Sequence, residues 1–270
     1  MIMHTIESRS AMPDRAQRTD RVFLPSANQA LADLEESTGK PVLIQEDQDL
    51  KVLATIHRAE AGESCHLLRI KGSNDHVSDY LITFECRMAL RDGQGQRSVL
   101  VEKRQVRERV ISEMEKLHRK LPLAKARELG KFMYNGLIVQ LRSTGPGLLV
   151  DRWIREHCPD LHEAQSRSIE SQITGNLGVL QGDSRANFPA RIYDSSVAMN
   201  AAYAIYGGDL LSRPHLGVPY LSQGHGELAR RLIADAMGDG GTTPTDRHII
   251  DAWAEELGVS NWYDWSERTE

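Results

Sequence analysis

The stretch Tyr80-Leu-Ile-Thr-Phe-Glu-Cys-Arg-Met-Ala-Leu90 divides the sequence into two kinds of pattern. Ahead of it, three short runs of β-forming residues follow Pro41, at 42–44, 52–56 and 66–70. The stretch itself is mostly apolar, and we expect a helix over about 79–91 that Ser78 or Asp79 caps. Helical patterns dominate the chain after residue 91. We therefore predict an α+β fold, with a helix plus a three-stranded sheet at the N-terminus and a mostly α-helical body.

The remaining helices are predicted from apolar spacing and from residues that start or stop helices. A first helix is expected from Ser26 to Thr38, ended by Gly39. Further helices are expected at 98–121, 123–141, 148–158, 161–180, 187–206, 224–237 and 246–257, the last capped by Thr245. The clearest break is Ser143-Thr-Gly-Pro-Gly147. We accordingly expect a flexible leader at 1–22, an α+β unit with long helices at 23–142, and an all-α domain at 148–270.

Composition excludes several classes of protein. The chain has 270 residues, of which 40% are hydrophobic and 26% charged, and a formal net charge of −5. These values are ordinary for a globular protein and exclude collagen-like, mucin-like and wholly disordered chains. No run approaches the roughly 18 apolar residues of a membrane span, and the polar N-terminal residues lack the apolar segment of a secretory signal. Three separated cysteines without a CxxC pair favour reduced thiols. We predict a soluble, cytoplasmic protein without a membrane partner.

Glu85 is the residue that fits its surroundings least. It lies beside Leu81 and Met88 on the apolar face of the predicted helix. A carboxylate there must be paired, protonated or exposed in a cleft, because burying it without a partner is costly. Arg69, Arg87 and Arg91 are candidate partners. Two interpretations stay open: a glutamate at a helix edge bonded to an arginine, and a catalytic carboxylate.

The order of elements around Glu85 gives a further interpretation. A helix, three short strands and an apolar helix centred on a glutamate, over residues 26–91, resemble the minimal zinc-metallopeptidase domain of the ImmA/IrrE type. In that family the helix carries HExxH, with two histidines as zinc ligands and the glutamate as general base. Here Phe84-Glu-Cys-Arg-Met88 occupies the motif, so both histidines are absent. The resemblance therefore implies a metallopeptidase-like scaffold without metal or proteolysis.

A second group of chemistry-bearing residues lies between Asp209 and Glu227. His215, His225 and Glu227 occupy a stretch rich in glycine and proline, which is typical of loops that form sites. They are candidate metal ligands or acid–base groups, with zinc as the cofactor of that alternative. Otherwise Glu227 starts a helix and complements its dipole. Among other candidates, Ser195 lacks the GxSxG context of a nucleophile, and adjacent Cys65 and His66 should form a buried cysteine and a surface histidine.

Two segments are candidate contact surfaces. Residues 102–131 contain ten basic and five acidic residues, a local charge of +5 within a chain of −5. Arg104 and Arg107 are assigned there to partner binding, while interspersed acids favour a solvated helical face and nucleic acid is an alternative partner. The C-terminal aromatic residues either pack on the protein's own core or anchor a partner or second subunit; they are Trp253, Trp262, Tyr263 and Trp265.

The sequence supports three functional hypotheses. The first is a non-enzymatic interaction or regulatory protein, without a cofactor and with a protein partner or a homo-oligomer. The second is a metal-dependent hydrolase whose ligands come from His66, His215, His225, Glu85 and Glu227. The third is a nucleic-acid-binding regulator that uses the basic helix at 102–131. We favour the first because every enzymatic motif in the sequence is incomplete.

Overall fold

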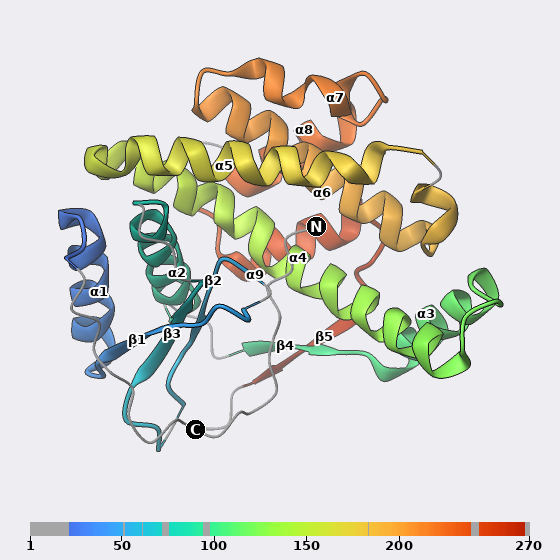
Figure 1. Cartoon of the computed structure of the whole chain (residues 1–270), viewed down its shortest axis with the longest axis horizontal. Coiled ribbons are helices and arrows are strands. Elements are labelled where there is room, and N and C mark those ends of the chain that lie inside the picture. The colour runs from blue at the N-terminus through green and yellow to red at the C-terminus, as the bar shows by residue number, and fades with distance from the viewer. Residues whose placement is uncertain are drawn as a thin grey trace. The chain divides into compact units, whose positions relative to one another are not determined.

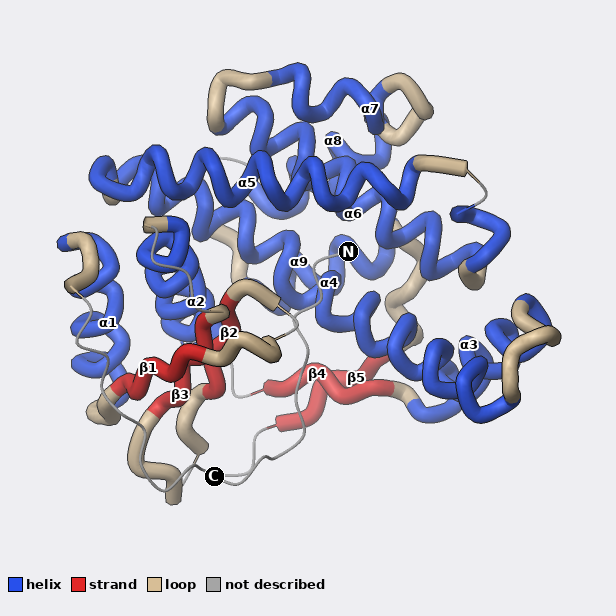
Figure 2. The backbone as a smooth tube through the Cα atoms, in the orientation of Figure 1, coloured by secondary structure: helices blue, strands red, loops and turns tan. Residues whose placement is uncertain are grey.

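The computed structural model describes residues 22–50, 52–60, 62–71, 76–93, 98–182, 184–238 and 243–267 (Figures 1 and 2). They form an α+β protein in which helices predominate, which confirms the predicted fold class. The predicted leader lies outside the described residues, except for Val22. None of the helices in these ranges combines the length and the apolar character that crossing a membrane requires.

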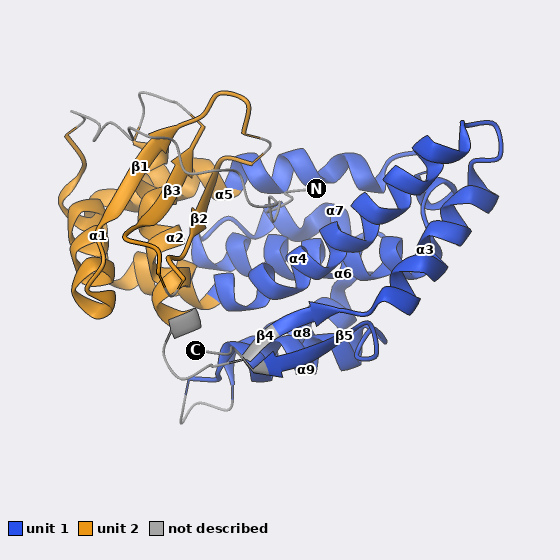
Figure 3. Cartoon of the chain, turned by 90° about the horizontal axis from the view of Figure 1, so that it is seen from below, with its two compact units in different colours: residues 1–3, 97–148, 170–269 blue, residues 4–96, 149–169, 270 orange. Residues whose placement is uncertain are grey.

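The described residues belong to two compact units, which Figure 3 colours separately. The N-terminal unit contains the described residues up to Gly93 and residues 149–169. The C-terminal unit contains 98–148 and 170–267. The expected boundary at 143–147 falls inside a single helix, α4 (Leu123–His157), whose two ends belong to different units.

The N-terminal unit is a three-stranded sheet with two helices on one face. Besides residues 149–169, its elements are α1 (Pro25–Thr38), β1 (Val42–Glu46), β2 (Ala54–His57), β3 (His66–Ile70) and α2 (Val77–Gly93). The strand order is β1-β3-β2, with β1 parallel and β2 antiparallel to β3. The alternating burial of β1 and β3 directs Val42, Ile44, Leu68 and Ile70 toward α1 and α2. The predicted elements at 26–38, 42–44, 66–70 and 79–91 are confirmed. The predicted cap of the last is wrong, because α2 begins at Val77 and therefore contains Ser78 and Asp79.

The C-terminal unit consists of helices and a two-stranded ribbon. Its elements are β4 (Ser98–Glu102), α3 (Arg104–Leu117), the first part of α4, the last part of α5 (His162–Asn176), α6 (Ala190–Leu210), α7 (Val218–Leu221), α8 (Gly226–Met237), α9 (Asp246–Glu256) and β5 (Tyr263–Glu267). The expected helix at 98–121 is therefore wrong at its start, where β4 pairs antiparallel with β5. The pairing strand lies more than 150 residues away along the chain, so no local pattern indicates it.

The predicted break at Ser143–Gly147 is also wrong, because α4 continues through Pro146. The contacts around position 145 explain why a glycine occupies it. A Cβ atom at this position would lie 2.6 Å from Cγ2 of Ile249 and 3.1 Å from Cε2 of Trp253. The glycine thus permits close packing of α4 against α9, and burial of this segment outweighs the poor helix propensity of glycine and proline.

The last helices agree with the sequence pattern. Helix α8 begins at Gly226 and α9 at Asp246, close to the expected starts at 224 and 246. Thr245 caps α9 as predicted, since its side chain accepts a hydrogen bond of 3.2 Å from the backbone N–H of His248. The expected helices at 161–180 and 187–206 correspond to α5 and α6, and the expected helix at 148–158 is the end of α4.

Candidate functional site

Helix α2 packs on two sides, and this decides where its polar residues lie. Ile82, Cys86 and Ala89 belong to the core under the sheet. The opposite side of α2 packs against the end of α4 in a second apolar cluster. This cluster consists of Tyr80, Val150, Ile154, Cys158, Leu161 and Ala164, and Phe84 and Met88 pack against it. Almost the whole circumference of α2 is therefore occupied by packing.

Glu85 is buried on this helix, with a relative exposure of 7%. The backbone of Ile56 in β2, an edge strand of the sheet, hydrogen-bonds to the Glu85 carboxyl group. Burial nevertheless raises the pKa of Glu85 from an ordinary value of 4.5 to about 8, so the protonated form predominates at neutral pH. The carboxyl group thus contacts a backbone group of the sheet edge in a buried environment.

Two of the predicted arginine partners are engaged elsewhere. The Arg87 guanidinium donates to Oδ2 of Asp33 at 2.6 Å and lies 3.6 Å from the ring centroid of Trp153. Arg69 forms a longer ion pair with Asp47, at 3.8 Å. Arg87 therefore connects α2 to α1 and to α4.

The residues of the HExxH register do not fit a zinc ion. Phe84 and Met88 pack into the second cluster, and neither an aromatic ring nor a thioether replaces a histidine ligand. Cys86 is fully buried, and burial raises its pKa, so the thiol is protonated. This donor set supplies no step of metal-dependent hydrolysis at α2.

A second buried carboxyl group, which the sequence pattern does not reveal, is Asp151 in α4. The Tyr80 hydroxyl donates to Oδ1 of Asp151 at 2.8 Å, and Gln165 Nε2 donates to its backbone oxygen at 2.7 Å and to Oδ1 at 3.4 Å. Burial raises the pKa of Asp151 to about 7, although the hydrogen bonds that Tyr80 and Gln165 donate to its carboxyl group oppose the shift. The partners lie 71 and 14 residues away, so spacing alone could not have identified this group.

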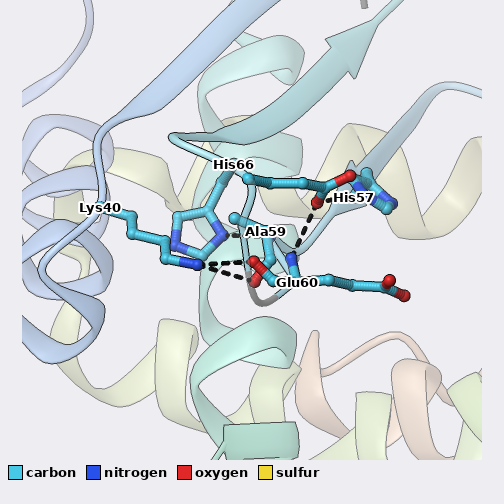
Figure 4. A network of polar contacts seen from close by, with 6 residues as sticks. Lys40, His57, Ala59, Glu60 and His66 are labelled. Carbon is cyan, nitrogen blue, oxygen red and sulfur yellow. Dashed lines mark hydrogen bonds and ion pairs between the residues drawn. The ribbon is translucent and has the colours of Figure 1, made fainter. Parts of the chain in front are cut away.

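His66 is a structural residue of the N-terminal unit (Figure 4). Its Nδ1 accepts from the backbone N–H of Ala59 at 2.9 Å, which assigns the proton to Nε2, and Nε2 donates to Thr38 Oγ1 at 2.8 Å. Lys40 donates to the backbone oxygen of Glu60 at 2.8 Å in the same network. Burial lowers the pKa of His66, and the positive charge of Arg58 lowers it further. Both ring nitrogens are thus engaged within the unit.

The expectation for the Cys65–His66 pair is half wrong. Cys65 is buried as predicted, but His66 is buried as well, at 1% exposure, instead of lying on the surface. The reason is the network around its ring, which connects β3 to the end of α1 and to the segment after β2. Hydrogen bonds at both nitrogens offset the cost of burying a neutral histidine.

The second predicted group does not converge. His215 is exposed, whereas His225 is half-buried directly before α8 and its pKa is lowered, mainly by burial. Glu227 is exposed in the first turn of α8 and pairs with Arg231 at 3.0 Å. Within the described ranges, no three His, Cys, Asp or Glu side chains are placed to hold a metal ion. Glu227 is therefore placed to complement the helix dipole and to form an i,i+4 ion pair.

Ser195 and Ser196 are buried in α6, at 2% and 4% exposure. Ser196 donates to Gln140 Oε1 at 2.8 Å, and Gln140 Nε2 donates to Asn200 Oδ1 at 2.9 Å. The chain therefore uses Ser196 to join α4 and α6 inside the C-terminal unit.

The C-terminal aromatic residues pack on the protein's own core. Trp253 is fully buried and donates to the backbone oxygen of Leu232 at 2.7 Å. Tyr263 and Trp265 donate to Oδ1 of Asp251 at 2.7 and 2.8 Å. Trp262 is 8% exposed and stacks on Tyr134 with 5.8 Å between the ring centroids. Of the two predicted alternatives, packing on the protein's own core is thus the one observed. Trp253, Trp262 and Tyr263 are buried and present little surface to a partner.

The arginines and lysines of the basic stretch differ in their surroundings. Arg107, assigned to partner binding, pairs with Glu102 at 3.3 Å, and Arg127 pairs with Glu115 at 2.7 Å, whereas Arg104 is exposed. Between α3 and α4, residues 116–125 contain four exposed cations and no acid, namely Lys116, Arg119, Lys120 and Lys125. We call residues 116–125 the hairpin tip.

The hairpin tip also exposes apolar side chains. Leu117 is 46% and Leu123 is 59% exposed, so both leucines lie in water among the cations. The two helices that carry them pack closely, because a Cβ atom on Gly130 would lie only 2.7 Å from Cα of Ile111. The His118 ring hydrogen-bonds to the backbone oxygen of Asn187 at 2.8 Å. A well-supported turn therefore presents these leucines and cations.

Comparison of the chain with protein-family models, curated proteins and solved structures finds no match. The resemblance to the ImmA/IrrE type stays a prediction. The fold defines the class of the chain as α+β.

Proposed function

We propose that this chain is a non-enzymatic interaction protein that binds an acidic surface of a protein partner through the hairpin tip. The observation that supports the proposal is the combination of four exposed cations with exposed Leu117 and Leu123 on one ten-residue turn. Cations steer an acidic partner toward the tip, while buried apolar side chains supply most of the affinity of a typical interface.

The leucines favour a protein partner over nucleic acid. Nucleic-acid interfaces depend on phosphate contacts, hydrogen bonds to bases and aromatic stacking. The tip has cations for phosphates but no Phe, Tyr or Trp, the His118 ring is bonded to Asn187, and the exposed side chains between the cations are aliphatic. An apolar cleft on a protein would bury these leucines, whereas a nucleic-acid groove would leave them without a counterpart.

The buried groups of α2 agree with a scaffold role. Glu85, Cys86 and their neighbours are used to pack α2 against the sheet and the end of α4. On this proposal, the metallopeptidase-like order of elements serves as a scaffold, and the binding residues lie in another part of the chain.

Site-specific photo-crosslinking tests the proposal. A photoreactive amino acid is placed at Leu117 or at Leu123 in the full-length chain in its native cells, and adducts are identified by mass spectrometry. Leu53, which is 41% exposed in the N-terminal unit, is the matched control position. We expect one acidic protein to be cross-linked at both tip positions, not at Leu53, and much less when Arg119→Glu and Lys120→Glu are added.

Two outcomes would overturn the proposal. Adducts that disappear on nuclease treatment would assign the tip to nucleic acid. Adducts that form equally at Leu53, or that persist unchanged after the charge reversal, would show that the tip has no specific protein partner.

A further inference from the structure

The N-terminal unit has a sheet edge at β1 that no described strand covers. The sheet order β1-β3-β2 makes β1 an edge strand, and among the described residues no strand pairs with its outer side. An edge strand presents backbone N–H and C=O groups on which another extended chain can pair. The register of the β1–β3 pair shows which residues of β1 have backbone groups that point to this edge.

The backbone N–H and C=O groups of the odd-numbered residues of β1 point toward β3. The Pro41 oxygen accepts from the N–H of His66 at 2.8 Å, and the Asp47 N–H donates to the oxygen of Ile70 at 2.9 Å. In a parallel pair, the residues that bond to the neighbouring strand alternate with residues that point away from it. The backbone groups of Val42, Ile44 and Glu46 therefore point to the open edge.

One of these groups is already satisfied. The Val42 N–H donates to Oε1 of Glu35 in α1 at 2.7 Å. This carboxylate covers the start of the edge and shows that Val42 does point outward. The next outward residue, Ile44, has no such cover among the described side chains, so the edge is open from Ile44 onward.

A hollow lies beside this edge, between β1 and α1. It measures about 240 Å³ and is lined by Phe23, Asn28, Leu31, Ala32, Glu35, Val42 and Ile44. Cofactor and drug-like ligands use pockets of roughly 300–1,000 Å³, so this hollow fits individual side chains better than a small molecule. The lining is mixed: the side chains of Leu31, Val42 and Ile44 suit an aliphatic side chain, and the carboxylate of Glu35 suits a cation.

We propose that the open edge of β1 and the hollow beside it bind an extended segment of a partner protein, which adds a strand to the sheet, inserts an aliphatic side chain beside Ile44 and places a basic side chain at Glu35. The alternation of a strand sets the pattern, because side chains on the α1 side recur every second residue. The segment that fits is basic-x-aliphatic-x-basic.

The acidic groups at the edge argue against a second copy of this chain as the occupant. If β1 paired antiparallel with β1 of another molecule about Ile44, Glu46 of one copy would lie opposite Val42 of the other, next to Glu35. Like charges at opposing positions of a sheet are destabilising. A partner strand with lysine or arginine at these positions turns the repulsion into attraction.

The test uses a capped heptapeptide, Thr-Lys-Thr-Leu-Thr-Lys-Thr, and the full-length protein. We expect saturable binding in fluorescence anisotropy and slower hydrogen exchange at the Ile44 and Glu46 amides, with little change at Val42, whose N–H is already bonded. N-methylation of the central leucine, or replacement of both lysines by glutamate, should weaken binding at least tenfold.

Two variants locate the site. Glu35→Gln keeps an oxygen that accepts from Val42 but removes the charge, and should weaken binding several-fold, whereas exposed Glu36→Gln on the same helix should not. Ile44→Pro removes an outward N–H, which an edge strand tolerates, and should abolish binding. Circular dichroism shows whether each variant is folded.

The opposite results would overturn the inference. These are absence of saturable binding by the peptide up to millimolar concentration, equal binding by the N-methylated peptide, and protection only at amides outside β1. Dimerisation of the protein that depends on Ile44 and excludes the peptide would assign the edge to a second copy instead.

Discussion

Helix α2 and the hairpin tip combine charged and apolar residues in opposite ways. In α2 the ionisable Glu85 is buried and apolar residues surround it, whereas at the tip Leu117 and Leu123 are exposed and cations surround them. The carboxyl group of α2 resembles a catalytic residue in the sequence, yet it packs against a sheet edge. The comparison shows that residue type alone does not tell a structural side chain from one that is available to a binding partner. The solvent exposure of the side chain and its contacts within the chain make that distinction.

The largest expected effect tests the packing of α2. The double variant Phe84→His and Met88→His restores the HExxH pattern but places two polar rings in the second apolar cluster. We expect a loss of about 3 kcal/mol or more in the free energy of unfolding, measured with urea, and no recovery with zinc. Phe132→His, at a side chain that is 49% exposed, is the control and should change it by less than about 0.5 kcal/mol.

Stoichiometric zinc binding that restores the stability of the double variant would contradict this account of α2. It would show that the scaffold still holds a metal-binding geometry, and that only the histidines are missing.

The next effect is the contribution that two buried carboxyl groups, those of Glu85 and Asp151, make to the pH dependence of stability. Their pKa values are raised in the folded protein, to about 8 for Glu85 and about 7 for Asp151. The unfolded chain therefore releases these protons first, and stability falls as pH rises from about 4 to 8 and then levels off. Glu85→Gln and Asp151→Asn should each flatten this fall, and at pH 8 each change should offset a penalty on the order of 1 kcal/mol or more.

Urea unfolding at a series of pH values measures this dependence. Buried His66 and half-buried His225, whose pKa values are lowered, contribute the opposite dependence, so each variant is compared with the wild-type chain. The same pH dependence in the wild-type chain and in both variants would show that Glu85 and Asp151 ionise as readily in the folded chain as in water.

A smaller effect is expected where the C-terminal ribbon meets α4. The Tyr134 hydroxyl donates to the oxygen of Trp262 at 2.5 Å and accepts from the N–H of Lys103 at 3.0 Å. Tyr134→Phe removes both of these bonds, but the Lys103 N–H still donates to the Trp262 oxygen at 3.2 Å, so the loss of unfolding free energy should be about 0.5–1.5 kcal/mol. An unchanged thermal transition would mean that the direct bond between the Lys103 N–H and the Trp262 oxygen is sufficient without the hydroxyl.

The smallest effect on stability belongs to the hairpin tip. Leu117→Ser with Leu123→Ser removes exposed side chains, so the free energy of unfolding should change by less than about 0.5 kcal/mol. The same variant should lose the cross-linked partner. A marked drop in thermal stability would show that these leucines contribute to the core rather than to a contact surface.

Local patterns predict much of this fold but little of its polar interior. The helix that Thr245 caps and the apolar face of α2 are visible in the sequence, because caps and helical spacing are local signals. The β4–β5 pair and the Tyr80–Asp151 bond depend on residues far apart in the chain. Gly145 and Pro146 predict a break, but contacts between α4 and α9 keep the helix intact.

The candidate site shows the same division. Composition locates the basic stretch, but only the structure separates paired Arg107 and Arg127 from the exposed cations of the tip. The exposure of Leu117 and Leu123 is likewise a property of the folded chain, since leucines at helical spacing normally predict burial.

The most direct test of the contact surface is a binding titration with the purified protein that cross-links at Leu117. Its affinity is measured by calorimetry at low and high salt, for the wild-type chain and for the Arg119→Glu and Lys120→Glu variant. We predict binding at least tenfold weaker for the variant at low salt, with the difference narrowing as salt screens the charges. Equal affinities of the two chains at low salt would contradict the assignment of the hairpin tip as the binding surface.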